Sequence, residues 1–322
     1  MKSDWQESMR DSFRDTRELS SFLNIELPEV SYPLFIPKDY AHLIKESSAL
    51  QRQFLPSIEE NDVGGEIDPI GDEVHFKTKR LIHRYKNRAL FIPTEICPIL
   101  CRYCFRKNEL GNNNDMFKPG EEQEIKNYLL DHPEIEEIIF TGGDPLILSN
   151  KKLEQYLSFF SSIDHIKMIR FHTRTPVILP SRIDEGFSQL IEKYSQFFSH
   201  ITLVIHSNHE DEWSDDFENC CKKLSKLPLQ LLSQSVLLKG VNDSARDLKN
   251  LFYGLTRLGI RPYYLHHPDK ARGAMHFYLS KKQGLEIYAE LKKEVSGWAL
   301  PHYVCETPAG QGKILTTNSI TH

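Results

Sequence analysis

The sequence predicts an α/β fold, a partial (βα)6 barrel with a helical N-terminal appendage and a short C-terminal segment. Three observations predict it. Apolar strand-like runs recur after residue 76, helix-like segments separate most of them, and polar side chains follow every run. Alternating strands and helices indicate a parallel sheet with helical crossovers. Because barrel enzymes gather their chemistry at the carboxyl ends of the strands, we expect the site there.

The elements follow one another in a regular order. Residues 1 to 55 carry apolar side chains at helical spacing, and residues 56 to 75 are acidic, contain glycine and indicate a connecting loop. Strands are expected at 89–93, 137–141, 167–172, 201–206, 230–236 and 262–267. Helices are expected at 121–131, 151–162, 184–197, 210–226, 244–258 and 281–295. We therefore divide the chain into an N-terminal part (1–75), the barrel (76–295) and a C-terminal segment (296–322).

The composition narrows the class of protein. Hydrophobic residues make up 39% and charged residues 26%, which is enough for a sizeable core. A net charge of -5 argues against a nucleic-acid-binding surface. No run approaches the ~18 apolar residues of a membrane span. The first residues lack an apolar signal core and are acidic, so we expect a cytoplasmic protein with reduced thiols and no membrane partner.

Three cysteines form the most informative motif. Cys97, Cys101 and Cys104 follow the first barrel strand at C-x3-C-x2-C spacing. Three thiolates on one loop can hold three corners of a 4Fe-4S cluster, whereas a ferredoxin cluster takes four, so the fourth iron would stay open to a small molecule. A zinc knuckle completed by His83 and His172, or three ordinary buried thiols, are the alternatives.

An open iron can chelate the amino and carboxylate groups of S-adenosylmethionine, and one electron then cleaves the sulfonium to an adenosyl radical. Gly142 and Gly143, after the second strand, would let the backbone approach the methionine end, and Asp144 would receive its ammonium. A β-turn with Asx hydrogen bonding is the alternative for this Gly-Gly-Asp-Pro stretch. Further contacts to this cofactor are expected from His172, Arg174 and Gln234.

A lysine near the carboxyl end forms the second motif. Lys313 lies in a glycine-flanked loop, and a lysine amine can form a Schiff base with pyridoxal phosphate, which acts as an electron sink. Upstream, Arg84 and Arg88 are spaced like one helical turn and suit a phosphate. A solvated terminal lysine and ordinary surface arginines are the alternatives.

Together these motifs resemble the lysine 2,3-aminomutase family of radical S-adenosylmethionine enzymes that also bind pyridoxal 5'-phosphate. The resemblance runs from about residue 75 to the end of the chain. It rests on HRYKNRALFI (83–92), CPILCRYCFRK (97–107), FTGGDPL (140–146), HTRTPVILPSRI (172–183), SQSVLLKGVND (233–243), RPYYLHHPDKARGAMHF (261–277) and PAGQGK (308–313). It implies conversion of (S)-α-lysine to (R)-β-lysine by a radical amino shift.

The resemblance also implies roles for single residues. The cluster ligands would be Cys97, Cys101 and Cys104, and the Schiff-base lysine Lys313. The remaining matches are Arg106 for the substrate carboxylate, Asp269 and Glu306 for the distal ammonium, and Arg84 and Arg88 near the pyridoxal cofactor. Glu306 departs from the aspartate of free-lysine mutases, and its extra methylene changes the reach of this acid. Ile314 and Leu315 also depart from the usual Thr-Pro.

Partners follow from the same resemblance. The run PYYLH before Asp-Lys points to the branch that supplies β-lysine for modification of elongation factor P, together with its lysine ligase. The family implies an electron donor such as flavodoxin or ferredoxin, and homo-oligomers. Two alternatives stay open: a radical S-adenosylmethionine enzyme of this family with weak or altered specificity, and a non-enzymatic iron–sulfur or zinc protein.

Overall fold

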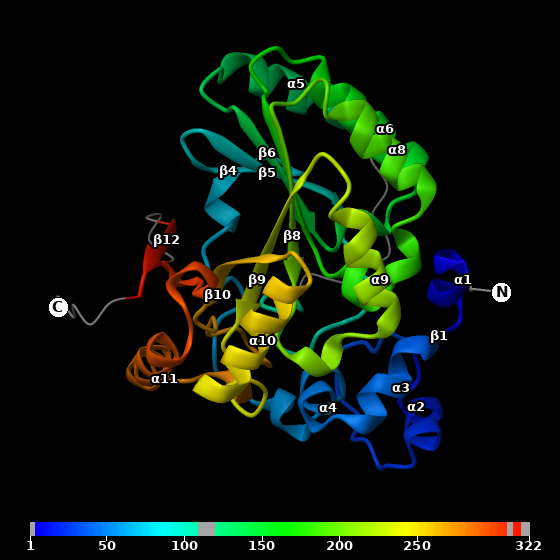
Figure 1. Ribbon diagram of the computed structural model, residues 1–322, viewed down its shortest axis with the longest axis vertical. Coiled ribbons are helices and arrows are strands. Elements are labelled where there is room, and N and C mark those ends of the chain that lie inside the picture. Colours follow the sequence, from blue (N-terminus) through cyan, green and yellow to red (C-terminus); the bar gives the residue numbers. More distant parts are fainter. Residues whose placement is uncertain (1–3, 109–119, 308–311, 317–322) are drawn as a thin grey trace.

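The computed structural model describes residues 4–108, 120–307 and 312–316. Its main element is a curved sheet, in which ten strands of the described residues follow the order β12-β11-β10-β9-β8-β7-β6-β5-β4-β3 (Figure 1). The strands from β5 to β11 run parallel, and β3, β4 and β12 are antiparallel to their neighbours. The sheet is open because its edge strands β3 and β12 do not pair, so the fold is an α/β partial barrel.

The parallel strands are β5 (Arg88–Thr94), β6 (Glu137–Gly142), β7 (Met168–Thr173), β8 (His200–His206), β9 (Gln230–Val236), β10 (Arg261–His266) and β11 (His302–Thr307). The antiparallel ones are β3 (Phe76–Thr78), β4 (Leu81–Tyr85) and β12 (Gly312–Leu315). The crossover helices are α5 (Glu121–Asp131), α6 (Asn150–Ser161), α8 (Glu185–Tyr194), α9 (Asp215–Leu224), α10 (Ala245–Arg257) and α11 (Lys281–Glu294). All six expected barrel strands are confirmed to within one residue at each end.

Helix starts follow from side-chain caps. Five crossover helices begin after a residue whose side-chain oxygen accepts a backbone N–H of the first turn: Ser149, Asp184, Ser214, Ser244 and Ser280. Such caps satisfy donors that the helix itself leaves unpaired. The expected helix 210–226 is corrected for this reason, because the cap at Ser214 separates a short 3-10 turn at Glu210–Glu212 from α9.

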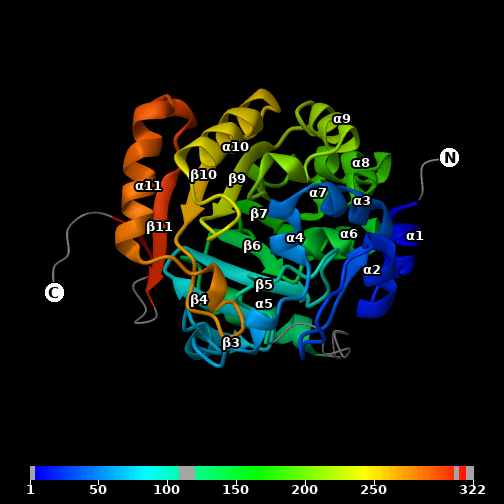
Figure 2. The ribbon, with the colours of Figure 1, turned by 90° about the horizontal axis from the view of Figure 1, so that it is seen from below.

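One hydrophobic core joins the sheet to its helices, which Figure 2 shows along the outer face of the strands. Between β5, β6 and α6, the rings of Phe91, Phe140 and Phe160 meet edge to face, with centroids 5.0–5.6 Å apart. Such aromatic pairs stabilise packing beyond the area they bury. This packing orients the strand ends that carry the site.

The structure corrects the sequence interpretation at both edges of the sheet. Strands β3 and β4 precede the first expected strand, and β11 and β12 follow the last, so the C-terminal segment continues the sheet. Arg84 and Arg88 do not lie one helical turn apart. They sit on β4 and β5 of a hairpin whose register pairs Tyr85 with Arg88.

The N-terminal residues form helices α1 (Trp5–Arg10), α2 (Thr16–Leu23), α3 (Lys38–Glu46) and α4 (Ser48–Phe54), and two short strands, β1 (Ser12–Phe13) and β2 (Ile36–Pro37), that were not expected. Two short 3-10 turns, Ile58–Asn61 and Glu73–His75, interrupt the expected loop. In the described part of the chain, none of the helices combines the length and apolar character that crossing a bilayer requires.

The N-terminal part forms hydrogen bonds and ion pairs with the cysteine segment. The amides of Leu100 and Arg102 donate to the carbonyls of Phe35 and Gln53, at 3.0 and 2.8 Å. The Arg102 guanidinium and the Lys107 amine both bind the Glu60 carboxylate, whose side chain is fully buried. The N-terminal part therefore stabilises the cysteine loop from outside the barrel.

Candidate active site

A cavity of about 410 Å³ opens at the carboxyl ends of the parallel strands. This volume suits a small-molecule site. Every residue that the sequence singled out for the site lines this one cavity: Cys97, Cys101, Cys104, Gly142, Gly143, Asp144, His172, Arg174, Gln234, Arg84, Arg88, Arg106, Asp269, Glu306 and Lys313. Residues up to 229 positions apart in the chain therefore share one chamber, because parallel strands end at the same edge of the sheet.

The three cysteines enter the cavity as free thiols. Burial raises the pKa of Cys97 well above its usual value, and the sulfurs of Cys104 and Cys101 raise it further. Burial and Cys101 likewise raise the pKa of Cys104 to about 12. Because the cysteines oppose one another's ionisation, their sulfurs must lie close together. A bound cationic centre would hold them as thiolates. The donor set therefore fits an iron–sulfur cluster.

The zinc alternative lacks a donor set. Among residues 4–108, 120–307 and 312–316, no three His, Cys, Asp or Glu side chains are grouped tightly enough for a single metal ion. His83 lies outside the cavity, and its Nδ1 is 2.8 Å from the Tyr128 hydroxyl. A cubane cluster does not require the three sulfurs to converge on a single ion, because each thiolate binds a different iron.

The glycine pair lines the cavity and is also required by packing against the segment that leads into Cys97. A Cβ on Gly143 would lie 2.3 Å from the Ile96 carbonyl oxygen, and one on Gly142 would lie 2.8 Å from the Thr94 carbonyl oxygen. Gly143 donates its amide to that Thr94 oxygen at 2.8 Å. The space that glycine frees is thus filled by the chain leading into Cys97.

The Asp144 carboxylate is already occupied, which favours the turn alternative for its side chain. It accepts hydrogen bonds from the Thr173 hydroxyl at 2.6 Å, the Arg174 amide at 2.6 Å, the Thr175 amide at 2.9 Å and the Leu146 amide at 3.0 Å. Its side chain is buried. The expected salt bridge to a methionine ammonium therefore has no open carboxylate oxygen in this structure.

At the other end of the cavity, Lys313 is held in strand β12, not in a loop. Its Cα pairs with that of Glu306 across β11, and its Nζ lies 2.5 Å from the Glu306 carboxylate. Arg84 binds the second oxygen of the same carboxylate at 3.2 Å. The Tyr85 hydroxyl accepts the Lys313 amide at 2.7 Å. Residues 308–311 of the PAGQGK motif lie outside the described residues.

The cations at this end fit a phosphate-bearing cofactor. The Arg84 Nε is buried and has no partner in the described part of the chain. The Arg88 guanidinium stacks over the Tyr85 ring at 3.7 Å from its centroid. A lysine amine, two guanidiniums and a stacked aromatic ring suit an aldehyde cofactor with an anionic tail.

Two further residues were expected to bind substrate, and each has a charged neighbour in the protein. Arg106 has a neighbour of opposite charge, and Asp269 has one of the same charge. Arg106 forms a buried ion pair with Asp72, a residue of the expected connecting loop. Burial raises the pKa of Asp269 to about 7, and the Glu306 carboxylate adds to this rise. The cavity thus holds one carboxyl group that titrates near neutrality.

Two more expected cofactor contacts lie on β7 and β9, the strands on either side of β8. His172 on β7 faces the cavity; its Nε2 is buried without a partner in the described part of the chain, and burial lowers its pKa well below the usual value. Gln234 on β9 is paired in register with His206 and Tyr264. A neutral imidazole and an amide leave polar atoms available to a ligand.

Several residues that line the cavity, or that contact a lining residue, escaped the sequence interpretation. Tyr85 and Tyr103 lie inside the motifs that were recognised, but nothing in their spacing marks a hydroxyl as a contact. Asp72 had no local signal, because an acid in an acidic loop looks solvated. Glu212 follows the fourth strand, where a fully buried acid was not distinguishable from a helix-capping one. Each was identified only through its three-dimensional contacts.

Three thiols on the loop after the first parallel strand of an open barrel define the radical S-adenosylmethionine class. A family model described as "Radical SAM superfamily" matches residues 91–252. This family uses a 4Fe-4S cluster and S-adenosylmethionine, so these are the cofactors of the chain.

Curated relatives narrow the class. The chain is 36% identical to the L-lysine 2,3-aminomutase of Escherichia coli, over 93% of this chain and 90% of that protein. It is 37% identical to the enzyme of the same name from Haemophilus influenzae, over 78% and 73% of the two chains. It is 35% identical to that of Buchnera aphidicola, over 91% and 86%. The chain belongs to the lysine 2,3-aminomutase family and is a radical S-adenosylmethionine aminomutase, an isomerase.

Proposed function

We propose that this aminomutase converts (S)-α-lysine to (R)-β-lysine with pyridoxal phosphate bound at Lys313. The observation that carries the proposal is that Lys313 and the three cysteines line one cavity. A radical source and an amine carrier must both reach the same substrate for the amino group to move between adjacent carbons. When bound, the pyridoxal ring supplies an electron sink for the migrating nitrogen.

The residues of the chain would divide the work as follows. Cys97, Cys101 and Cys104 hold the cluster, and the strand ends around Gln234 and His172 receive S-adenosylmethionine. Arg84 and Arg88 neutralise the phosphate of the pyridoxal cofactor. Of the remaining charged groups in the cavity lining, Arg106 would bind the carboxylate of the amino acid, and Asp269 with Glu306 would bind its distal ammonium. Charge-assisted hydrogen bonds of this kind fix orientation as well as affinity.

The product would serve elongation factor P. The run PYYLH before Asp-Lys supports the branch of the family that β-lysylates this factor, the EpmB branch, with a lysine ligase as the next enzyme. A flavodoxin or ferredoxin would deliver the electron, and the enzyme would work as a homo-oligomer in the cytoplasm, where thiols stay reduced.

Glu306 favours a second candidate, an enzyme of the same family with weak or altered amino-acid specificity. Its carboxylate binds Lys313 at 2.5 Å and Arg84 at 3.2 Å, so both of its oxygens are engaged within the protein. The Lys313 and Arg84 cations therefore compete with a substrate ammonium for the Glu306 carboxylate. This candidate predicts low turnover of free lysine and higher turnover of another amine.

Product analysis tests the proposal. Anaerobically reconstituted protein is incubated with lysine, S-adenosylmethionine, pyridoxal phosphate and dithionite. The amino acids are then separated by chiral chromatography and identified by mass spectrometry. We expect (R)-β-lysine, and none from Lys313→Ala. The control is Lys292→Ala, an exposed lysine of α11. If Lys313→Ala still forms β-lysine, the assignment of this residue is wrong.

A further inference from the structure

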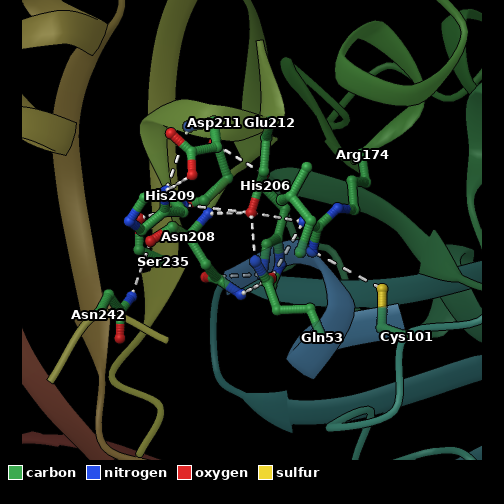
Figure 3. A network of polar contacts seen from close by, with 12 residues as sticks. Gln53, Cys101, Arg174, His206, Asn208, His209, Asp211, Glu212, Ser235 and Asn242 are labelled. Carbon is green, nitrogen blue, oxygen red and sulfur yellow. Dashed lines mark hydrogen bonds and ion pairs between the residues drawn. The ribbon is translucent and has the colours of Figure 1, made fainter. Parts of the chain in front are cut away.

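The buried guanidinium of Arg174 contacts a cysteine that the cluster needs. Its Nη1 lies 3.6 Å from the Cys101 sulfur, a hydrogen-bond distance for sulfur (Figure 3). The same nitrogen also donates to the Tyr103 hydroxyl. The side chain of Arg174 is only 7% exposed. The expectation from sequence placed this residue against S-adenosylmethionine, whereas the described contacts of its guanidinium involve a cluster ligand.

A fixed carboxylate orients this guanidinium. Glu212 binds Arg174 Nη2 at 2.7 Å. The same carboxylate accepts from the Ser207 hydroxyl at 2.9 Å, the Asn208 amide at 3.0 Å and the Gln53 side-chain amide at 3.1 Å, so it has no freedom to turn. Gln53 in turn accepts from Arg174 at 3.3 Å. Arg174 is therefore held with one nitrogen on the network and another on the sulfur.

The contact acts on the charge of the sulfur. The Cys101 sulfur lies 3.6 Å from a nitrogen of the almost fully buried Arg174 guanidinium. A positive charge and an N–H donor next to a thiolate stabilise negative charge on it, and more strongly so where water is excluded. Hydrogen bonds to cysteine sulfurs are among the features that set the reduction potential of iron–sulfur clusters.

We propose that Arg174, oriented by Glu212 and Gln53, raises the reduction potential of the cluster through its contact with the Cys101 sulfur. In the step concerned, a low-potential one-electron donor gives one electron to the cluster, which goes from the 2+ to the 1+ state. No bond forms or breaks. The added negative charge spreads over the irons and the three thiolates, where the guanidinium stabilises it. The proposal rests on the cluster that the family uses and not on the identity of the amino-acid substrate.

A redox titration monitored by electron paramagnetic resonance tests this role on reconstituted protein of matched iron content. For Arg174→Gln we expect the equilibrium constant for reduction to fall at least tenfold, which is a shift of 59 mV to more negative potential. The control is Arg170→Gln, a half-buried arginine on β7, the strand that ends just before Arg174; its guanidinium binds Glu137 at 2.8 Å, and its hydrogen bonds in the described part of the chain involve no cysteine. We expect less than a twofold change there. An equal potential in Arg174→Gln and the parent protein overturns the proposal.

A second pair of measurements covers a variant that fails to assemble its cluster. Arg174→Lys keeps the charge, but one ammonium cannot reach both Glu212 and Cys101, so we expect a smaller shift in the same direction. In the parent protein labelled with ¹⁵N-arginine, pulsed spectroscopy of the reduced cluster should detect a ¹⁵N coupling that is lost in Arg174→Lys. A purely structural role for Arg174 would lower stability and leave the potential unchanged, which would contradict the proposal.

Discussion

Asp269 is the residue whose protonation should govern amine binding. Burial and the nearby Glu306 raise its pKa to about 7 in the ligand-free protein. A carboxyl group binds an ammonium only when it is ionised, and a raised pKa means that it is neutral below about pH 7. The pKa of the free enzyme appears in kcat/KM. We therefore predict that kcat/KM for lysine falls about tenfold per pH unit below pH 7.

The variant Asp269→Asn separates this effect from other titrations. It should abolish the acid limb of the pH profile and lower kcat/KM at pH 8 by about 10- to 100-fold, the range for losing a hydrogen bond to a charged group. A profile whose acid limb persists in Asp269→Asn would show that another group titrates.

Glu306 offers a test of specificity at the same scale. We predict that Glu306→Asp raises kcat/KM for free lysine about tenfold, because a side chain shorter by one methylene cannot keep both the Lys313 and Arg84 contacts and frees an oxygen for the substrate. That factor corresponds to about 1.4 kcal/mol. Initial rates of β-lysine formation measure it, with Glu306→Gln as the uncharged control. A slower Glu306→Asp enzyme would contradict this account of the acid.

Single residues were predictable where their chemistry is rare. Three clustered cysteines and a lysine among glycines indicate cofactors whatever their surroundings. The hydrogen bonds of Asp144 were not predictable, because three of its four donors lie at the end of the neighbouring strand β7 and have no local signature. Tyr103 and Glu212 were missed because their residue types are common; Tyr103 is distinguished only by its contact with Arg174, and Glu212 only by its full burial.

At the scale of elements, the turn after β6 supports the cysteine loop. A Cβ on Gly143 would lie 2.3 Å from a backbone oxygen of Ile96, a contact that flexible side chains cannot relieve. We predict that Gly143→Ala destabilises the apoprotein by about 1–3 kcal/mol, as overpacking does. It should also retain less iron, because the start of the cysteine loop must move.

Urea unfolding and iron analysis measure the two effects. The matched control is Gly297→Ala, where an added Cβ meets no atom within 4 Å and the backbone is not in the left-handed region. Its stability should stay within about 0.5 kcal/mol. If Gly143→Ala behaves like Gly297→Ala in both measurements, the turn does not support the loop.

The elements themselves were predictable where hydrophobic runs and helix caps coincide. Strand β9 and helix α5 have the boundaries expected from sequence; for α5 the local signal is a glycine followed by acidic residues in the first turn. Strand β12 was missed because it is half-exposed and carries the polar Lys313, and β11 was missed because its buried run, Tyr303 to Cys305, is only three residues long. What makes them strands is pairing with a neighbour, which local sequence does not reveal.

At the scale of the whole molecule, the N-terminal part acts as a clamp on the barrel. Glu60 is fully buried between Arg102 and Lys107, which flank Cys104. Removing one partner of a buried ion pair leaves uncompensated charge and costs about 3–5 kcal/mol. We predict a loss of that size for Glu60→Ala in anaerobic urea unfolding of the apoprotein.

The neighbouring acid provides the control. Glu59 forms an ion pair with Arg52 at the surface, where 46% of its side chain is exposed. Surface pairs contribute about 0–1 kcal/mol, so Glu59→Ala should change stability by no more than that. Equal losses in the two variants would mean that the N-terminal part does not clamp the cysteine loop.

The central claim is that one cavity brings a radical source and an amine carrier to the same substrate. Isotope transfer measures this directly: lysine deuterated at its β-carbon is incubated with the reconstituted enzyme, and S-adenosylmethionine and β-lysine are recovered for mass spectrometry. We predict deuterium in the adenosyl 5' position of the recovered S-adenosylmethionine and in the (R)-β-lysine. Cleavage of S-adenosylmethionine that leaves all the deuterium in unreacted lysine would contradict the account.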